Sequence, residues 1–281
     1  MPRVAAVPDD PQVDSVDASA IRRGLAGEAL GGHIYVFADV TSTNAVLRDL
    51  ADAGAGAGTV VVAESQRAGR GRHDSAWFSP PGLNLHVSVL LRPAIAASAA
   101  PVFSFIASLA LTEAMWTLGV PAAVKWPNDV MVGDRKVAGA RLDVATDGSR
   151  VRYVVVGVGV NANVPRAELE AALGPLAAGA TSLREEVGRP VDRNAFAAAF
   201  LNFLDKWVEL YRAQGPDFVM DAWRTRDVLH GCHVRVQDGT EPDFCGRVVG
   251  IDPRGCLQVD DPQGVRHTVV SAAVRPLGNA R

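Results

Sequence analysis

Apolar segments with the pattern of strands alternate along this chain with segments that have the pattern of helices. The segments 59–64, 85–92 and 151–161 are rich in β-branched residues or alternate in polarity, and are predicted to be strands. The segments 99–118 and 192–213 are predicted to be long helices. This alternation predicts an α+β fold in which a mixed β-sheet has flanking helices.

The pattern changes after about Leu229, where four short strand-like segments follow one another without a helical segment between them. They are CHVRVQD, CGRVVGID, CLQVDD and RHTVVS, separated by turn residues. Such spacing predicts a small β-barrel or open sheet of about 50 residues. At the other end, residues 1–25 are rich in aspartate and are predicted to be a disordered tail. The expected domains are therefore 26–228 and 229–281.

The composition argues against several classes of protein. The 281 residues carry a formal net charge of −3, from 28 basic and 31 acidic side chains, which disfavours a general binder of nucleic acid or membranes. Cys232, Cys245 and Cys256 have no CxxC spacing, so neither a disulfide framework nor a zinc site is expected. No apolar run approaches the roughly 20 residues of a membrane span, and no secretory signal is visible. A reduced, cytoplasmic setting is expected.

The segment AESQRAGRGRHDSAWFSPPG, residues 63–82, is rich in arginine and glycine and has no apolar periodicity, so it cannot be core. One interpretation is a solvated loop whose arginines aid solubility. The other is a flexible anion clamp, because guanidinium groups bind phosphate or carboxylate and glycines let the backbone close around a ligand. Trp77, at the far end, would then supply a flat surface for a base.

Two further strings carry polar residues that packing explains poorly. In KWPNDV, Lys125 ends an apolar strand just before a proline. It is either an edge-strand charge before a turn, or a cation aimed into a cleft with Asn128 and Asp129 beside it. In TSTN, which begins at Thr41, four hydrogen-bonding side chains either cap a helix or bind an uncharged polar group such as a ureido group.

In their order and spacing, these strings resemble those of biotin–protein ligases. TSTN, AESQRAGRGR…W, KWPNDV, KVAGA and GVGVNAN follow one another, and the resemblance spans residues 30–275 because the C-terminal segment is similar to the family's SH3-like domain. It implies a class II synthetase-like catalytic domain followed by an SH3-like β-barrel. It also implies two reactions: biotin and ATP, with Mg²⁺, give biotinyl-5′-AMP, and a lysine of the biotin carboxyl carrier domain of a biotin-dependent carboxylase then accepts the biotin.

The resemblance also implies roles for single residues. Lys125, Arg72 and Asp129 match catalytic positions. No motif implies metal ligands, so Mg²⁺ is expected to be held largely by phosphates. The residues that match biotin-contacting positions are Ser42, Thr43, Asn44, Gln66, Arg67, Arg70, Gly71, Arg72, Lys125 and Gly139. Those that match ATP-contacting positions are Arg70, Arg72, Trp77, Lys125, Asn128 and Asn161.

The chain departs from the family pattern in two places. After GRGR the family usually continues with basic residues, whereas this chain has His73, Asp74 and Ser75, so the loop loses positive charge. Arg141 and Asp143 stand where the family tends to have an aliphatic residue and a glutamate. The stretch before the first strand is too short for the winged-helix DNA-binding domain of some members. A monofunctional ligase, monomeric or weakly dimeric, is therefore expected.

The residues leave two other classes of function to consider. GVGVNA, residues 157–162, fits the dinucleotide fingerprint G-x-G-x-x-A, but the following strand that a nicotinamide-dependent oxidoreductase needs is not predicted. A nucleic-acid-binding module would combine the GRGR loop with the β-rich C-terminal segment, but the net charge and the 6% aromatic content disfavour it. Lipoate ligases share the adenylation chemistry, and KWPND together with GRGR favours biotin.

Overall fold

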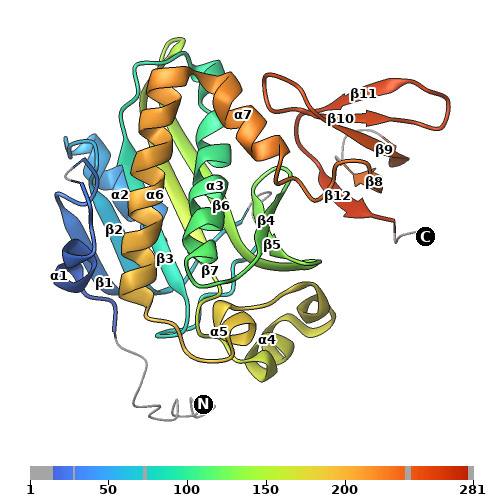
Figure 1. Ribbon diagram of the computed structural model, residues 1–281. Coiled ribbons are helices and arrows are strands. Elements are labelled where there is room, and N and C mark those ends of the chain that lie inside the picture. Colours follow the sequence, from blue (N-terminus) through green and yellow to red (C-terminus); the bar gives the residue numbers. More distant parts are fainter. Residues whose placement is uncertain (1–14, 28, 72–74, 238–241, 278–281) are drawn as a thin grey trace.

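A seven-stranded mixed sheet forms the centre of the protein (Figure 1). The computed structural model describes residues 15–27, 29–71, 75–237 and 242–277. The strands of this sheet are β1 (Ile34–Val40), β2 (Val60–Gln66), β3 (Leu85–Leu91), β4 (Ala122–Lys125), β5 (Asp129–Val132), β6 (Arg135–Asp147) and β7 (Arg150–Val160). Their spatial order is β1-β2-β3-β7-β6-β5-β4, with β1 parallel to β2 and the other neighbours antiparallel. The predicted mixed sheet is confirmed.

The two faces of this sheet are covered by different helices because successive strand residues point to opposite faces. Val60 and Val62 belong to the large core that contains α3 (Val102–Trp116) and α6 (Arg193–Gln214). Val61 instead packs with Leu47 of α2 (Thr43–Asp52) on the other face. α2 is only ten residues long, so part of this second face is left for the residues of the site described below.

The helix α3 is the most apolar of the long helices among the described residues. Together with the preceding turn η2 (Ala97–Ala99) it forms the segment Ala97–Trp116, which is long and apolar enough to cross a membrane by length and composition alone. In this protein 78% of its most apolar window is buried. Its apolar character is therefore explained by its place against the sheet and beside α6 (Figure 1).

Shorter helices connect these elements. One of them is α4 (Arg166–Leu173), which continues into η3 (Gly174–Gly179). Two more were not predicted: α5 (Leu183–Val187), and α7 (Pro216–Arg224), which leads from α6 toward the C-terminal strands. Gly215 has a φ of +81°, a conformation that suits glycine, and it separates α6 from α7.

The C-terminal segment forms a separate antiparallel sheet of five strands. The four predicted strands are present as β8 (His233–Gln237), β9 (Phe244–Ile251), β10 (Leu257–Asp260) and β11 (Arg266–Val269). A fifth strand, β12 (Ala273–Pro276), pairs with β8 and was not predicted. The order β11-β10-β9-β8-β12 has no pairing between its two outer strands in the described part of the chain, so the sheet is open there.

This small sheet packs against the larger domain, which contains the seven-stranded sheet, through a few close contacts. Trp126 donates its indole N–H to the carbonyl of Gly255 at 2.8 Å. Gly255 has a φ of +83°, and a Cβ there would lie 2.5 Å from the ring of Phe105, so the backbone approaches α3 as closely as only glycine allows. The segment between α7 and β8 pairs with β4, since the backbone N–H of Val124 donates to the carbonyl of Arg226 at 3.0 Å.

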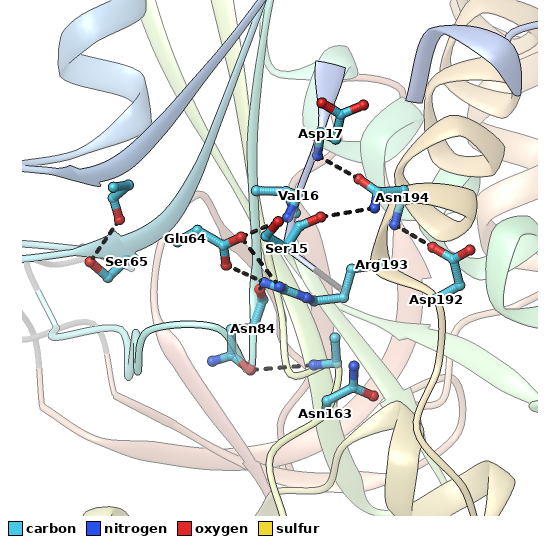
Figure 2. A network of polar contacts seen from close by, with 12 residues as sticks. Ser15, Val16, Asp17, Glu64, Ser65, Asn84, Asn163, Asp192, Arg193 and Asn194 are labelled. Carbon is cyan, nitrogen blue, oxygen red and sulfur yellow. Dashed lines mark hydrogen bonds and ion pairs between the residues drawn. The ribbon is translucent and has the colours of Figure 1, made fainter. Parts of the chain in front are cut away.

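The predicted disordered tail of residues 1–25 is wrong for the residues from 15 on, while residues 1–14 lie outside the described part. Ala18–Arg23 form α1, in which Ile21 is fully buried. The amide of Val16 donates to Glu64 Oε1 at 2.6 Å, and the Glu64 carboxylate pairs with the buried Arg193 at 2.6 Å (Figure 2). Glu64, held by its ion pair with Arg193, thus fixes the backbone at Val16. This contact joins residues far apart in the sequence, so the sequence pattern did not reveal it.

Candidate active site

A cavity of about 370 Å³ lies between the N-terminus of α2, the loop after β2, and strands β6 and β7. We call it the first cavity. Ser42, Thr43, Asn44 and Gln66 line it, as do Arg70 and Gly71, and the further predicted residues Trp77, Asn128 and Gly139 also lie in its wall. Most of the residues predicted to contact biotin are therefore brought together in one place.

Glycines form the floor of the first cavity. Gly139 of β6 pairs with Gly159 of β7. Gly157 precedes Gly159 by two residues, so it lies on the same face of β7. A Cβ at Gly157 would overlap the Asn44 amide, and a Cβ at Gly159 would lie 2.6 Å from the indole of Trp77. The glycines of GVGVNA thus let the side chains of Asn44 and Trp77 pack directly on the strand. This explains the glycines without a bound dinucleotide.

The uncharged polar end of the cavity is a connected set of hydrogen bonds. Gln66 Oε1 accepts from the backbone N–H of Thr43 at 2.9 Å. Ser88 donates to Asn44 Oδ1 at 2.6 Å, although its Oγ also lies 2.8 Å from the Thr43 hydroxyl. Ser42 is the N-cap of α2, yet its side chain makes no capping bond. TSTN therefore starts the helix without a capping bond from Ser42, and it also lines the cavity, while its binding of an uncharged polar group stays a prediction.

One donor at this end is buried with no partner among the described residues, namely Asn44 Nδ2. Trp77 Nε1, across the cavity, is likewise buried and has no partner in the described part of the chain. Leaving such donors unsatisfied costs about 1–3 kcal/mol each, so both are suited to a ligand with acceptor atoms.

The cation that the structure places beside Trp77 is Lys136, for which no role was predicted. Lys136 Nζ lies 5.1 Å from the centroid of the Trp77 ring and 2.5 Å from Asp129 Oδ1. Lys136 lines the first cavity and a third cavity of about 240 Å³. It belongs to the KVAGA string, which was recognised in the sequence without a role for its lysine.

Lys125 is the last residue of β4, and of the three cavities it lines only the third. Its pKa is lowered from the ordinary lysine value, chiefly by burial and further by the charges of Lys136 and Arg275, against the opposing effect of Asp129. Neutralising anions would relieve this repulsion. Lys125 is therefore placed to meet an anionic part of a ligand in the third cavity, which shares Asn128 and Lys136 with the first.

The predicted loop residues differ in where they lie. Arg70 and Gly71 line the first cavity, and the loop is closed by a bond from Gly71 N–H to the Ser75 carbonyl at 2.7 Å. Arg67 does not line it, because its guanidinium is exposed and pairs with Asp39 at 2.8 Å. Arg72 lies outside the described residues, together with positions 73 and 74.

The two asparagines predicted to contact ATP have different surroundings. Asn128 donates to the carbonyl of Ala140 at 2.5 Å and lines all three cavities described here. Asn161 is buried, donates to the carbonyl of Thr181 at 2.9 Å, and lines none of the three. Its position organises the segment before α5.

A second cavity of about 780 Å³ lies between β6, the start of α3 and the small C-terminal sheet. Its wall is mostly apolar, and it shares Asn128, Ala140 and Arg141 with the first cavity. The shared wall makes the two cavities neighbours, so that a ligand in one lies close to the other.

Of the charged residues that line the first cavity, Arg70 was predicted to contact a ligand and the others were not. Among those described, the wall has four cationic side chains and one carboxylate, which are Arg48, Arg70, Lys136, Arg141 and Asp143. Arg48 is on α2. Its role could not be predicted from the sequence, because most helices of this length have charged residues on their exposed face. Within the described residues, no group of three or more histidine, cysteine, aspartate or glutamate side chains could hold a metal ion. The donor set thus suits an ion whose ligands are mostly phosphate oxygens and water.

Comparisons with known proteins show which family the chain belongs to. The model of the biotin/lipoate A/B protein ligase family matches residues 36–161. The chain is 35% identical over 243 residues to the biotin–[acetyl-CoA-carboxylase] ligase of Paracoccus denitrificans, covering 85% of this chain and 98% of that protein. It is 34% identical over 266 residues to the enzyme of the same name from Mycobacterium tuberculosis, covering 92% and 94%. The solved biotin protein ligase from Aquifex aeolicus in complex with biotin and ATP has a TM-score of 0.71 at 23% identity, covering 87% of this chain and 99% of that one.

Proposed function

The chain belongs to the biotin protein ligases of the biotin/lipoate A/B protein ligase family, and from this we propose how its three cavities divide the reaction. The protein is an ATP-dependent ligase that activates biotin as biotinyl-5′-AMP and transfers it to a carboxylase. We assign biotin to the first cavity and the phosphates of ATP to the region between the first and third cavities.

The observation that carries this assignment is the buried Asn44 amide N–H₂, which has no partner among the described residues. It lies beside Thr43 and Gln66, at the uncharged end of the first cavity. Biotin has an uncharged ureido group at one end, with a carbonyl acceptor and two N–H donors, and a carboxylate at the other. The uncharged end of the cavity can satisfy the ureido group, while the cations at the loop can meet the carboxylate.

In the first step the biotin carboxylate attacks the α-phosphorus of ATP, and the bond to pyrophosphate breaks. The two anions repel each other by about 4 kcal/mol per pair of unit charges at 4 Å and an effective dielectric constant near 20. Cations must therefore be in place when they meet. Lys136 lies between the first and third cavities, so we give it the role that the sequence analysis gave to Lys125.

Lys125 is then assigned to the phosphates in the third cavity. There it is accompanied by Lys136 and Arg275, and Asp129 is the acidic residue in the described wall. When bound, Mg²⁺ supplies further neutralisation of the phosphate charge, with phosphate oxygens as its main ligands. No protein nucleophile is needed, because the substrate carboxylate itself attacks.

In the second step the neutral amine of an acceptor lysine attacks the carbonyl carbon of biotinyl-5′-AMP. The bond to AMP breaks and the amine loses a proton. Asp129 is held 2.5 Å from Lys136, so in this proposal it orients that lysine. A role of Asp129 in accepting the proton stays a prediction, which Asp129→Asn tests by the rate of transfer from preformed biotinyl-5′-AMP.

The finer assignments of partner and domain follow from the same proposal. We propose the biotin carboxyl carrier domain of the carboxylase as the acceptor, by the names of the relatives. We propose that the catalytic domain includes α1 and extends to residue 228, and that 229–281 is an SH3-like accessory domain, whose Arg275 reaches the third cavity.

The test is to incubate the protein with biotin, ATP, Mg²⁺ and a carboxyl carrier domain, and to measure the mass of that domain. We expect the mass of one biotinyl group to be added to a single lysine. Reactions without ATP, and reactions with lipoate or octanoate in place of biotin, are the controls. Equal modification by lipoate, or none by biotin, would contradict the assignment.

A further inference from the structure

Trp77 supplies an aromatic side chain to the wall of the first cavity. Residues 77–80 nevertheless belong to no helix or strand, so secondary structure alone does not fix the position of the indole. A Cβ at Gly159 would lie 2.6 Å from that indole, and Lys136 Nζ is 5.1 Å from its ring centroid. Such close contacts depend on a backbone that is held in place around Trp77.

Asn84 connects this backbone to the end of β7. It is fully buried and directly precedes β3. Its Nδ2 donates to the carbonyl of Phe78 at 2.8 Å, next to Trp77. Its Oδ1 accepts from the backbone N–H of Ala162 at 3.3 Å, two residues beyond the end of β7. One side chain thus links the residue that follows Trp77 to the strand on which the indole lies.

A buried ion pair holds Asn84 itself (Figure 2). Arg193 Nη1 donates to the carbonyl of Asn84 at 3.1 Å and to Glu64 Oε2 at 2.6 Å. Arg193 Nη2 donates to Glu64 Oε1 at 3.3 Å, so the planar guanidinium bonds the carboxylate with both terminal nitrogens. Glu64 lies in β2 and Asn84 directly precedes β3, so one guanidinium holds together the two ends of the segment that connects these strands.

We propose that Asn84 is a positioning residue for adenylation, which holds the indole of Trp77 on β7 through the Phe78 carbonyl. The inference rests on the proposed function, in which the first cavity binds biotin. Neither Asn84 nor Arg193 lines any of the three cavities, so both act without touching the substrate. A displacement of about 1 Å in a positioned group costs about 100-fold in rate. Removal of the Asn84 side chain is therefore expected to slow adenylation, although it removes no group that lines a cavity.

The alternative is that Asn84 only satisfies buried backbone groups, and so contributes to stability alone. Asn163 is the matched control, because it is also fully buried and also makes two side-chain hydrogen bonds, both to the backbone of Val191. Neither Asn163 nor Val191 lines any of the three cavities. Asn163→Ala thus removes as many of these bonds as Asn84→Ala does, without releasing the carbonyl of Phe78.

We would measure biotin-dependent ATP–pyrophosphate exchange for the parent, Asn84→Ala, Trp77→Ala and the double variant, together with the urea midpoint of each. Asn84→Ala should slow exchange by about 10- to 100-fold, and Trp77→Ala by at least as much. In the Trp77→Ala background, Asn84→Ala should add a loss of less than about threefold, because Asn84 acts through Trp77. Asn163→Ala should lower the urea midpoint as Asn84→Ala does, and should exchange at the parental rate.

Three outcomes overturn the inference. Losses that multiply in the double variant would show that Asn84 acts by a route other than Trp77. A parental rate for Asn84→Ala or for Trp77→Ala would show that no positioning takes place. A loss of rate in Asn163→Ala as large as that in Asn84→Ala would show a general effect of stability.

The design separates this inference from the proposed function. If the parent shows no biotin-dependent exchange, the proposed function fails and the inference fails with it. If the parent exchanges pyrophosphate and Asn84→Ala does so equally fast, only the role of Asn84 fails. Asn84→Asp keeps the acceptor for Ala162 and loses the donor to Phe78. It replaces the alanine variant if circular dichroism shows that the latter does not fold.

Discussion

Replacing Gly159 by alanine tests whether Trp77 must lie directly on β7 for adenylation. The new Cβ would lie 2.6 Å from both Cε2 and Nε1 of the indole. Carbon atoms in contact are normally about 3.5–4.0 Å apart, so the ring must move by about 1 Å. A displacement of about 1 Å in a positioned group costs about 100-fold in rate, or roughly 2.7 kcal/mol of transition-state stabilisation. We expect this loss in the rate of biotin-dependent ATP–pyrophosphate exchange.

The same substitution is expected to leave the fold intact. Gly159 is in the interior of β7 and is not among the glycines with positive φ, so alanine fits the backbone. Removing a glycine from a strand stabilises by about 0.5–1 kcal/mol, because the unfolded chain loses freedom. The free energy of unfolding in urea should therefore stay equal or rise while the exchange rate falls.

Gly56→Ala is the matched control, because a Cβ at Gly56 meets nothing within 4 Å and its φ is not positive. We expect this variant to exchange pyrophosphate at the parental rate. If Gly159→Ala did so as well, the close contact between Trp77 and the strand would have no part in catalysis, and the proposed geometry of the first cavity would be refuted.

Three further outcomes are expected. Lys136→Ala should slow pyrophosphate exchange by 10²-fold or more while Lys125→Ala slows it less, since only Lys136 lines the first cavity; the reverse order would restore the sequence-based assignment. Asn44→Asp should weaken biotin binding by about 10- to 100-fold in calorimetry, because a carboxylate cannot donate to the ureido carbonyl; unchanged binding would place biotin elsewhere. Burial raises the pKa of Asp227 to about 6, so Asp227 keeps its proton to a higher pH in the folded state than in the unfolded state. The free energy of unfolding therefore falls as the pH rises from about 4 to 6. Asp227→Asn should remove this fall and stabilise the protein by up to about 3 kcal/mol at pH 7, which urea unfolding at pH 5 and 7.5 measures.

The spacing of apolar residues predicted those strands and helices that bury an apolar face in the core. The strands around Val61 and the helix around Ile106 have enough apolar residues to be recognised alone. The segment that contains Ile21 was missed because its stability comes from tertiary contacts, among them the Glu64–Arg193 pair, which are far apart in sequence. Isolated helices as short as α1 have no signal of their own.

The site was predicted as a set of strings, and the structure decides which side chains of those strings meet. Ser42, Asn44 and Gln66 meet as expected, because the ends of β1 and β2 lie together in a parallel pair. Lys125 and Lys136 could not be ranked from sequence, since both belong to matching strings. Only the hairpin of β5 and β6, with its register shift at Val130, decides which lysine lies at the glycine floor.

Asn128 has a consequence for inhibitor chemistry. Of the residues that line the cavities in the described part of the chain, it alone is common to all three. A compound that links mimics of two substrates held in neighbouring cavities would pass close to this side chain. Resistance by changing Asn128 would sacrifice its bond to Ala140 between β5 and β6, so escape at this point would also weaken the enzyme.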